Sequence, residues 1–134
     1  MNIKLIQDKS FIELSKLFYE YNQYLTTKYN HNSSIKILIS ELDKVDSQAL
    51  GLFKGAKLVG FTLGHKYSED LFYFSSMYIK PKYRYYMKNL FLASEANIKS
   101  RYSGWVSHSS TPSGINMHSK MGATPIEIKY YKEL

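Results

Sequence analysis

Positively charged and aromatic residues are concentrated between an apolar stretch and a helical pattern in residues 78–91, YIKPKYRYYMKNLF. Lys82, Arg84 and Lys88 supply the charge, and Pro81 ends the apolar stretch because it has no amide hydrogen to donate to a strand. Free backbone amides at the start of a helix attract negative charge, so a basic turn between a strand and a helix is typical of an anion-binding site. This stretch therefore predicts a site for a phosphate or a similar anion.

The predicted anion-binding turn contains no glycine. Glycine permits unusual φ angles and lets a ligand approach the backbone closely, which is why phosphate-binding turns so often carry it. The residues alone leave two interpretations open: a phosphate-binding turn that has lost its glycines, or a turn that never bound phosphate.

Other patterns that carry chemistry are absent from the sequence. There is no cysteine, which excludes disulfides, thiolate metal sites and a cysteine nucleophile. The four histidines, His31, His65, His108 and His118, do not have the spacing of metal ligands, so we expect no metal site. No nucleophile elbow, Walker-type motif or dinucleotide fingerprint occurs.

The charge and the tyrosines of the turn also suggest a nucleic-acid partner. The formal net charge of +7 and the pI near 9.4 favour a polyanionic partner or an anionic cofactor. Tyr83, Tyr85 and Tyr86 could stack on the bases of a single strand. They could equally pack the turn against neighbouring helices or a partner protein, and a lysine-rich composition is also what an AT-rich coding sequence produces.

The length and composition describe a chain that can form its own core. With 134 residues, 44% of them hydrophobic, the chain has the size of a single domain, residues 1–134. No apolar run approaches the roughly 20 residues of a membrane span, and the first ten residues lack the apolar segment of a secretory signal. We therefore expect a soluble protein with no membrane partner, located in the cytoplasm or, if it is of phage origin, in a virion.

The first half of the chain predicts a strand, two helices and a hairpin. A short strand at residues 2–7 precedes a helix with an apolar stripe, and residues 24–32 are polar and predict a loop. A second helix follows, and strands at 49–53 and 57–63 flank a compact turn. The expected inner face of that second helix consists of Ile35, Leu38, Ile39 and Leu42.

The second half predicts a crossover and a further helix. An aromatic strand at 71–79 leads through the basic turn into a helix at about 86–100, whose inner side is Leu90, Phe91, Ser94 and Ile98. A strand at 102–107, a helix opened by Pro112 and closed by Gly122, and a terminal strand at 124–131 follow. The order β-α-α-β-β-β-α-β-α-β predicts one α/β domain with a mixed sheet.

In this order of elements the chain resembles the GNAT family, the Gcn5-related N-acetyltransferases. The resemblance covers most of the chain and is strongest in residues 58–92 and 111–131, where KLVGFTLG (57–64) and MYIKPKYR (77–84) follow the family's hairpin and strand patterns. It implies a GNAT-like (acyl-CoA N-acyltransferase) α/β fold, a mixed central sheet flanked by helices. Because the chain stops after the first strand of the usual C-terminal pair, we expect a sheet that is truncated or completed by another chain.

The resemblance implies acetyl-CoA as the cofactor. The strand end that carries Met77 and Ile79 would pair with the pantetheine arm, and Arg84 takes the arginine or glutamine position of the family's turn motif. Asn116 falls near the asparagine of the later helix. The pyrophosphate would lie against the turn formed by Arg84, Tyr85, Tyr86, Met87, Lys88 and Asn89.

The turn departs from the family motif at both glycine positions, which are occupied by Met87 and Asn89. Methionine adds a side chain where the phosphate would lie. Asparagine is smaller and tolerates the left-handed backbone better than most residues. We therefore expect Met87 to be the greater obstacle to a bound pyrophosphate.

The candidate catalytic residues are two histidines. His118 stands where many family members carry the tyrosine that protonates the departing CoA thiolate, and His108, in the loop SHSS, could serve as a base for the amine. For each, the alternative is a structural polar residue. The central strand offers only hydroxyls in place of the usual acid, and water held by Ser75 or Ser76 is a weaker alternative for moving the proton.

Three functions remain open from the sequence. The first is an N-acetyltransferase that moves an acetyl group from acetyl-CoA to an amine. The second is a non-catalytic structural or interaction protein with a GNAT fold, for example a phage virion component, in which an exposed edge strand favours a protein partner, a homo-oligomer or a larger assembly. The third is a nucleic-acid-binding module.

Overall fold

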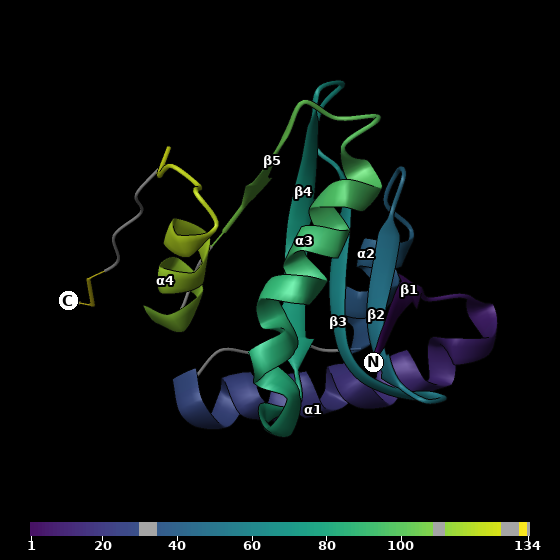
Figure 1. Ribbon diagram of the computed structural model, residues 1–134. Helices are drawn as coiled ribbons and strands as arrows, with labels where there is room; N and C mark the ends of the chain where they lie inside the picture. The colour runs from purple at the N-terminus through teal and green to yellow at the C-terminus, as the bar shows by residue number, and fades with distance from the viewer. Residues whose placement is uncertain (30–34, 109–111, 127–131, 134) are drawn as a thin grey trace.

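One five-stranded sheet organises the part of the chain that the computed structural model describes, residues 1–29, 35–108, 112–126 and 132–133 (Figure 1). Its strands lie in chain order, the first four pair antiparallel, and the fifth is parallel to the fourth. The strands are β1 (Asn2–Leu5), β2 (Gln48–Lys54), β3 (Lys57–Lys66), β4 (Leu71–Ile79) and β5 (Gly104–Ser107). This is the mixed sheet that the sequence predicts.

Helices cover both faces of the sheet (Figure 1). The helices are α1 (Phe11–Tyr29), α2 (Ile35–Leu42), α3 (Met87–Ile98) and α4 (Pro112–Lys120), and two 3-10 helices, η1 (Asp8–Ser10) and η2 (Pro81–Tyr86), precede α1 and α3. α1 and α2 pack on one face, and α3 packs on the other. Within the described residues, no helix is both long enough and apolar enough to cross a membrane.

Three apolar clusters hold these layers together. The first joins α1 and α2 to the sheet around Phe18 and Phe61, whose ring centroids lie 5.9 Å apart. The second joins Leu90 of α3 to β2, β3 and β4. The third places Phe72 and Phe74 of β4 against the end of α3, with β5 and α4 at its border. β4 contributes to all three clusters, so its position in the molecule is tightly fixed.

Helix α1 is longer than the sequence predicts. The loop expected at residues 24–32 is wrong at its start, because the helix continues to Tyr29. Leu25 is buried, and the ring centroid of Tyr24 lies 5.8 Å from that of Tyr78. Packing of these two side chains against the rest of the molecule extends the helix into a stretch whose composition is polar.

The predicted inner face of α2 is only half correct. Leu38 is fully buried and Leu42 packs at the border of the first cluster, whereas Ile35 and Ile39 are 46% and 49% exposed. A helix of eight residues contacts the sheet along a single narrow line. The other two isoleucines therefore lie on its flank.

The predicted pattern of α3 is confirmed in full, including its one polar member. Leu90, Phe91, Ser94 and Ile98 are the buried residues of the helix. Ser94 is tolerated there because its hydroxyl donates to the carbonyl of Leu90 at 2.9 Å and lies 2.7 Å from the hydroxyl of Thr62. A buried hydroxyl with two partners costs little free energy.

The described residues at the C-terminal end test only part of what the sequence predicts there. Gly122 has a φ of +81° directly after α4, as expected for a left-handed helix cap. The predicted terminal strand at 124–131 is absent from residues 124–126, and residues 127–131 lie outside the described part of the chain. Whether the sheet is truncated stays a prediction.

Candidate functional site

Among the strands that the structure describes, the C-terminal half of β4 has a neighbour on one side only. β5 pairs only with Leu71–Phe74, and its last residue, Ser107, lies opposite Phe74. β4 continues to Ile79, paired with β3 alone among the described strands. Figure 1 shows β5 leaving β4 at this point and leading to α4. We call residues 75–79 the open edge of β4.

A β-bulge lies where the open edge begins. Leu63 of β3 pairs with Ser76 and Gly64 pairs with Phe74, so Ser75 is an extra residue on β4. Its hydroxyl donates to the carbonyl of Leu63 at 3.2 Å, and the Ser107 hydroxyl donates to the carbonyl of Phe74 at 2.8 Å. Bulges bend a strand and end regular pairing, so this one separates the paired half of β4 from the open edge.

The peptide groups of Met77 and Ile79 face the open side. The amide of Lys80 donates to the carbonyl of Val59 at 2.9 Å, and in an antiparallel pair alternate residues bond to the same neighbour. Tyr78 therefore bonds toward β3, and the two residues beside it point away from β3. The Nε of Arg84 accordingly reaches the carbonyl of Ile79 at 3.2 Å. Both predicted cofactor-binding positions lie on a strand edge that can pair with an extended ligand.

The turn after β4 takes a helical path that needs no glycine. η2 runs directly into α3, and Met87 has ordinary helical angles, φ −56° and ψ −46°. The amide of Tyr83 donates to the carbonyl of Lys80 at 2.8 Å, and that of Met87 donates to the carbonyl of Arg84. These two amides are therefore already used within the turn.

Met87 does not project in front of the turn as the sequence led us to expect. It is half-buried and packs with Tyr83 and Tyr86 against the second apolar cluster. Its side chain is turned toward the sheet because a helical turn, unlike a glycine-rich loop, presents its first residue to the core.

The side chain of Arg84 points inward. It is half-buried, with its guanidinium carbon 4.8 Å from the ring centroid of Tyr24 and 5.8 Å from that of Tyr78. The exposed residues between 81 and 89 are Pro81, Lys82, Tyr85, Lys88 and Asn89. Of the three tyrosines considered for base stacking, only Tyr85 is largely exposed, at 73%, and its ring centroid lies 4.4 Å from that of Tyr86.

His118 and Asn116 lie on different sides of α4. His118 is half-buried with its ring centroid 5.7 Å from that of Trp105, and burial lowers its pKa. Asn116 is exposed. Two residues along a helix differ by about 200° in direction, so the two predicted site residues do not converge. His118 belongs to the layer that Trp105 forms between β5 and α4.

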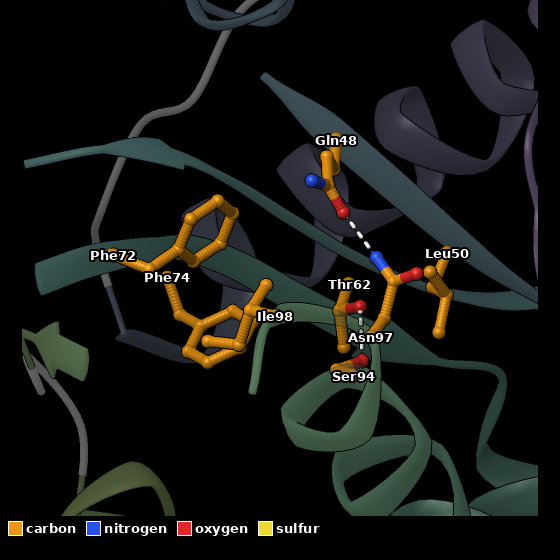
Figure 2. Close-up of a pocket in the computed structure, with 8 residues that line it drawn as sticks. All are labelled: Gln48, Leu50, Thr62, Phe72, Phe74, Ser94, Asn97 and Ile98. Carbon is orange, nitrogen blue, oxygen red and sulfur yellow. Dashed lines mark hydrogen bonds between the residues drawn. The ribbon is translucent and has the colours of Figure 1, made fainter. Parts of the chain in front are cut away.

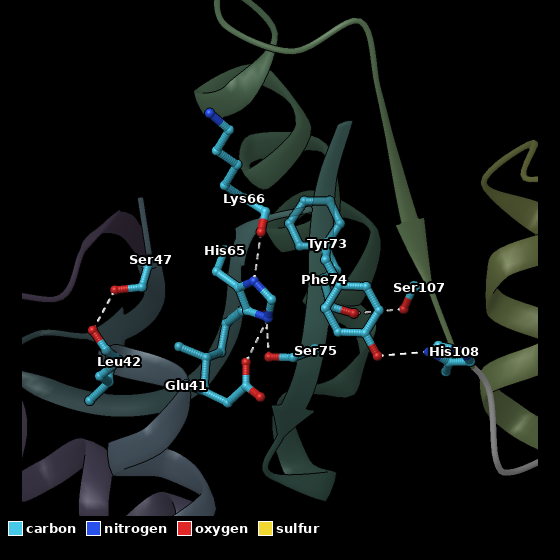
Figure 3. A network of polar contacts seen from close by, with 11 residues as sticks. Glu41, Leu42, Ser47, His65, Lys66, Tyr73, Phe74, Ser75, Ser107 and His108 are labelled. Atoms are coloured by element: carbon cyan, nitrogen blue, oxygen red, sulfur yellow. Dashed lines mark hydrogen bonds and ion pairs between the residues drawn. The ribbon is translucent and has the colours of Figure 1, made fainter. Parts of the chain in front are cut away.

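His108, which directly follows β5, belongs to a row of polar side chains that crosses β4 and β3 to reach α2 (Figure 3). Its Nδ1 lies 2.8 Å from the hydroxyl of Tyr73 on β4, whose ring centroid is 5.3 Å from that of His65 on β3. The Nε2 of His65 lies 3.0 Å from Oε2 of Glu41 on α2. We call Glu41, His65, Tyr73 and His108 the polar row.

The polar row is electrostatically connected. Burial first, and then the negative charge of Glu41, raise the pKa of Tyr73. His65 and Glu41 are only 15% and 19% exposed. The row lies beside the bulge, since His65 pairs with Tyr73 one step before the pairing of Gly64 with Phe74.

Sequence reasoning missed Glu41 and His65. The sequence predicted a strand at 57–63 and gave His65 no role beyond excluding it as a metal ligand, whereas β3 continues to Lys66. Glu41 stands 24 positions earlier, on a helix, and no sequence pattern links the two. A continued two-residue alternation from Phe61 through Leu63 to His65 was the one available signal.

Two hollows lie away from the open edge. The first, of about 10 Å³, is surrounded by β2, β3, β4 and α3 (Figure 2). It holds the Thr62–Ser94 hydrogen bond and one from Asn97 to Gln48, and it has room for roughly one water. The second, of about 650 Å³, is lined by β1, the start of α1, the start of β2 and the end of α3, with no residue of β4 or β5.

Metal ligands do not gather in the described part of the chain, where no three His, Cys, Asp or Glu side chains are placed to share an ion. The polar row offers side-chain hydrogen bonding, and the open edge offers backbone pairing.

Solved structures have the same overall fold. The BH1408 protein from Bacillus halodurans, in a tetramutant form, superposes with a TM-score of 0.81 at 11% identity over 100% of both chains. A ribosomal-protein-alanine N-acetyltransferase from Brucella melitensis gives 0.75 at 18% identity over 99% of this chain and 97% of that one. The chain has a GNAT-like fold.

A third neighbour of this GNAT-like fold is an aminoglycoside acetyltransferase from an uncultured soil metagenomic sample, solved with sisomicin. It has a TM-score of 0.72 and 14% identity, and the alignment covers 99% of this chain and 95% of that chain. No protein-family model and no curated protein matches the sequence. Identities of this size establish the fold, whereas function has to be argued from the site.

Proposed function

We propose that this GNAT-like protein is an N-acetyltransferase that binds acetyl-CoA along the open edge of β4 and transfers the acetyl group to an amine. The observation that carries the proposal is the direction of the Met77 and Ile79 peptide groups, which face the side that β5 leaves. A strand edge with unpaired amides and carbonyls is a ready partner for an extended chain.

The pantetheine arm of CoA is such a chain, since it is linear and carries two amide groups. Two residues two positions apart on one strand edge present donors and acceptors in the same direction. The carbonyl of Ile79 already accepts a hydrogen bond from Nε of Arg84. The amide of Ile79 and the amide and carbonyl of Met77 are therefore the principal partners for the pantetheine arm.

The phosphate groups would be held more by side chains than by backbone amides. Two amides of the turn are already bonded inside it, whereas Lys82 and Lys88 face solvent. Lysine binds phosphate as a mobile point charge. Affinity for acetyl-CoA should therefore fall strongly as salt is added.

The transfer itself requires a neutral amine and a departing thiolate. The amine nitrogen attacks the thioester carbon, the new C–N bond replaces the C–S bond, the sulfur leaves with the electron pair, and the proton that the nitrogen loses ends on the sulfur. His118 would assist the thiolate from α4. Because burial lowers its pKa, it would donate a hydrogen bond from the neutral ring rather than a proton from a charged one.

Two classes of acceptor are suggested by the fold neighbours. One is named for the alanine of a ribosomal protein and another for aminoglycosides. Both classes offer a primary amine, on a peptide or on an amino sugar, and these are the acceptors to test first.

Amide chemical shifts during an acetyl-CoA titration test the proposed binding mode. We expect the amide signals of Met77 and Ile79 to move most, because they would gain hydrogen bonds. Tyr78, whose amide faces β3, and Lys4 in β1 serve as internal controls. Unchanged Met77 and Ile79 signals at millimolar acetyl-CoA would refute the proposal.

A second candidate function is a non-catalytic protein that keeps the fold for contact with a partner. The helical turn, with its bonded amides and with Arg84 turned inward, favours it. Met87→Gly separates the two candidates. Acetyl-CoA binding that appears only in this variant would mean that the natural turn has lost its cofactor site, which supports the non-catalytic protein. Equal binding in both proteins supports the N-acetyltransferase.

A further inference from the structure

Two basic turns lie at the same end of the sheet. The turn between β2 and β3 is beside the turn after β4, because Gly60, near the start of β3, pairs with Ile79, the last residue of β4 (Figure 1). Residues 47–68 and 71–94 include both turns and contain no Asp or Glu. Two stretches that are separate in the sequence therefore add their positive charges at one end of the molecule.

Four lysines of these turns can meet a partner. Lys54 and Lys57 are exposed between β2 and β3, and Lys82 and Lys88 are exposed after β4. Lys54 and Lys57 are direct cross-strand partners, so their side chains leave the same face of the hairpin. None of the four forms an ion pair with another described residue, whereas the neighbouring Lys80 has a carboxylate partner at 3.4 Å. Their charges are therefore available to an anionic ligand.

The two lysines after β4 form a row with an exposed tyrosine. Lys82, Tyr85 and Lys88 are spaced by three residues, and Lys82 and Tyr85 belong to η2. Side chains three residues apart in a 3-10 helix lie above one another, with a rise of about 6 Å. Lys88 continues the row as the second residue of α3. Tyr85 therefore stands between two positive charges.

Aromatic contacts join this row to the hairpin. The ring centroids of Tyr85 and Tyr86 lie 4.4 Å apart, and Tyr85 is 73% exposed. A hydrogen bond with Tyr85 raises the pKa of Tyr86, and the charge of Lys54 opposes this rise. The Nζ atoms of Lys54 and Lys82 lie 5.6 Å and 5.9 Å from the ring centroid of Tyr83. The hairpin and the row therefore form one surface.

The members of this surface differ from those that the sequence suggested. Tyr83 is half-buried in the second apolar cluster, and Arg84 packs against the rings of Tyr24 and Tyr78. The hairpin, more than twenty positions earlier in the chain, supplies other positive charges in their place. We call Lys54, Lys57, Lys82, Tyr85 and Lys88 the basic patch.

We propose that the basic patch binds a single-stranded nucleic acid. Its lysines neutralise phosphates, and an unpaired base stacks on Tyr85, which is the combination by which proteins bind single strands without sequence preference. Phosphates and base faces are common to all nucleotides. RNA and DNA should therefore both bind, with little dependence on sequence.

This inference does not rest on acetyl transfer. Lys82 and Lys88 would also meet the phosphates of acetyl-CoA, whereas Lys54 and Lys57 have no part in the proposed cofactor site. Variants of the two hairpin lysines therefore separate the two ligands.

Salt dependence reports how many lysines contact phosphates. Labelled oligothymidylate and oligouridylate of about 12 nucleotides, a length within the usual site sizes, serve as probes in fluorescence anisotropy. A plot of log affinity against log salt concentration should have a slope of about −3, or about −0.7 for each of the four lysines. A slope near zero for both probes overturns the inference.

Matched double variants test whether the hairpin takes part. Lys54→Gln combined with Lys57→Gln should halve the slope for both probes. Lys9→Gln combined with Lys16→Gln removes the same charge from exposed positions on η1 and α1 and should leave the slope unchanged. Equal effects of the two double variants would mean that only the net charge matters, and would overturn the inference.

Variants of Tyr85 test the stacking. Tyr85→Ala should weaken binding of both probes about tenfold, whereas Tyr85→Phe, which keeps the ring, should bind like the wild type. Tyr19→Ala, at a 66% exposed position on α1, is the control and should have no effect. A duplex should bind more weakly than a single strand, because its bases are already stacked. Full binding by Tyr85→Ala, or equal affinity for the duplex, contradicts the proposal.

Other anionic ligands give the remaining controls. The Lys54→Gln and Lys57→Gln double variant should keep the wild-type affinity for acetyl-CoA in calorimetry, and a comparable loss would assign both lysines to the cofactor site and overturn the inference. Binding to phosphatidylserine vesicles without binding to either oligonucleotide also overturns it. Oligonucleotide binding without acetyl-CoA binding supports the inference and refutes the proposed function.

Discussion

The two halves of β4 differ in what they contribute. The first half, Leu71–Phe74, has a strand on each side and buries Phe72 and Phe74 against the end of α3. The second half, the open edge, pairs with one strand only within the described part of the chain, and Ser75, Ser76 and Met77 are half-exposed. One end of the strand holds the molecule together, and the other leaves hydrogen-bonding capacity for a ligand.

The closed end is reinforced where β5 begins. Asp46, in the loop after α2, accepts hydrogen bonds from the guanidinium of Arg101 and from the hydroxyl of Tyr102. Asp46 has a φ of +56°, a left-handed conformation that this residue type tolerates. We call Asp46, Arg101 and Tyr102 the clamp. It holds the segment between α3 and β5 to the loop between α2 and β2, so β5 can diverge from β4 only beyond this point.

Proline substitutions give the largest expected contrast along the strand. Tyr78→Pro removes an amide that bonds to β3 and should destabilise the fold by about 3 kcal/mol or more, or prevent folding. Met77→Pro removes an amide that faces the open side and should cost far less. Urea unfolding of both variants checks this, and similar losses would contradict the orientation inferred for the open edge.

Alanine substitutions should show the same contrast in the side chains. Phe72 is 1% exposed, and its ring centroid lies 5.1 Å from that of Phe74, so Phe72→Ala should lower the free energy of unfolding by about 3–5 kcal/mol. Met77→Ala, at a half-exposed position, should cost roughly 1 kcal/mol. Denaturant midpoints measure both losses. A larger loss for Met77→Ala than for Phe72→Ala would mean that the second half of β4, and not the first, stabilises the fold.

The clamp predicts a smaller, pH-dependent effect. The hydroxyl of Tyr102 and the nearby Arg101 hold the pKa of Asp46 below its usual value, so its contribution is present near neutral pH and is lost as the solution becomes more acidic than about pH 4. Asp46→Asn keeps the left-handed backbone and should cost about 1 kcal/mol at neutral pH.

The difference between Asp46→Asn and the wild type should shrink as the pH falls. Thermal unfolding across this range measures it. A difference that stays constant down to the most acidic conditions would assign the cost to packing rather than to the carboxylate charge.

The sequence predicted the parts of the fold that depend on local pattern. The bounds of β4, Leu71–Ile79, and the buried face of α3 follow from apolar spacing alone. Helix α1 is longer than the sequence predicted, because Leu25 and Tyr24 are held by contacts with distant parts of the chain.

The candidate site was harder to predict, because it depends on register and on contacts between distant elements. Met77 and Ile79 were named from a resemblance, and only the pairing of β3 with β4 gives the direction of their peptide groups. The Glu41–His65 pair joins a helix to a strand, and nothing in the spacing of the two residues indicates it. The orientation of Met87 depends on the helical path of its turn, which the absence of glycine allowed but did not specify.

Calorimetric titration of acetyl-CoA into the full chain and into Met77→Pro tests the central claim most directly. The open edge of β4 predicts binding to the wild type at micromolar concentrations, and affinity at least about tenfold weaker in the variant, which corresponds to the loss of one hydrogen bond. No detectable heat at millimolar acetyl-CoA, or equal affinity of the two proteins, would contradict it.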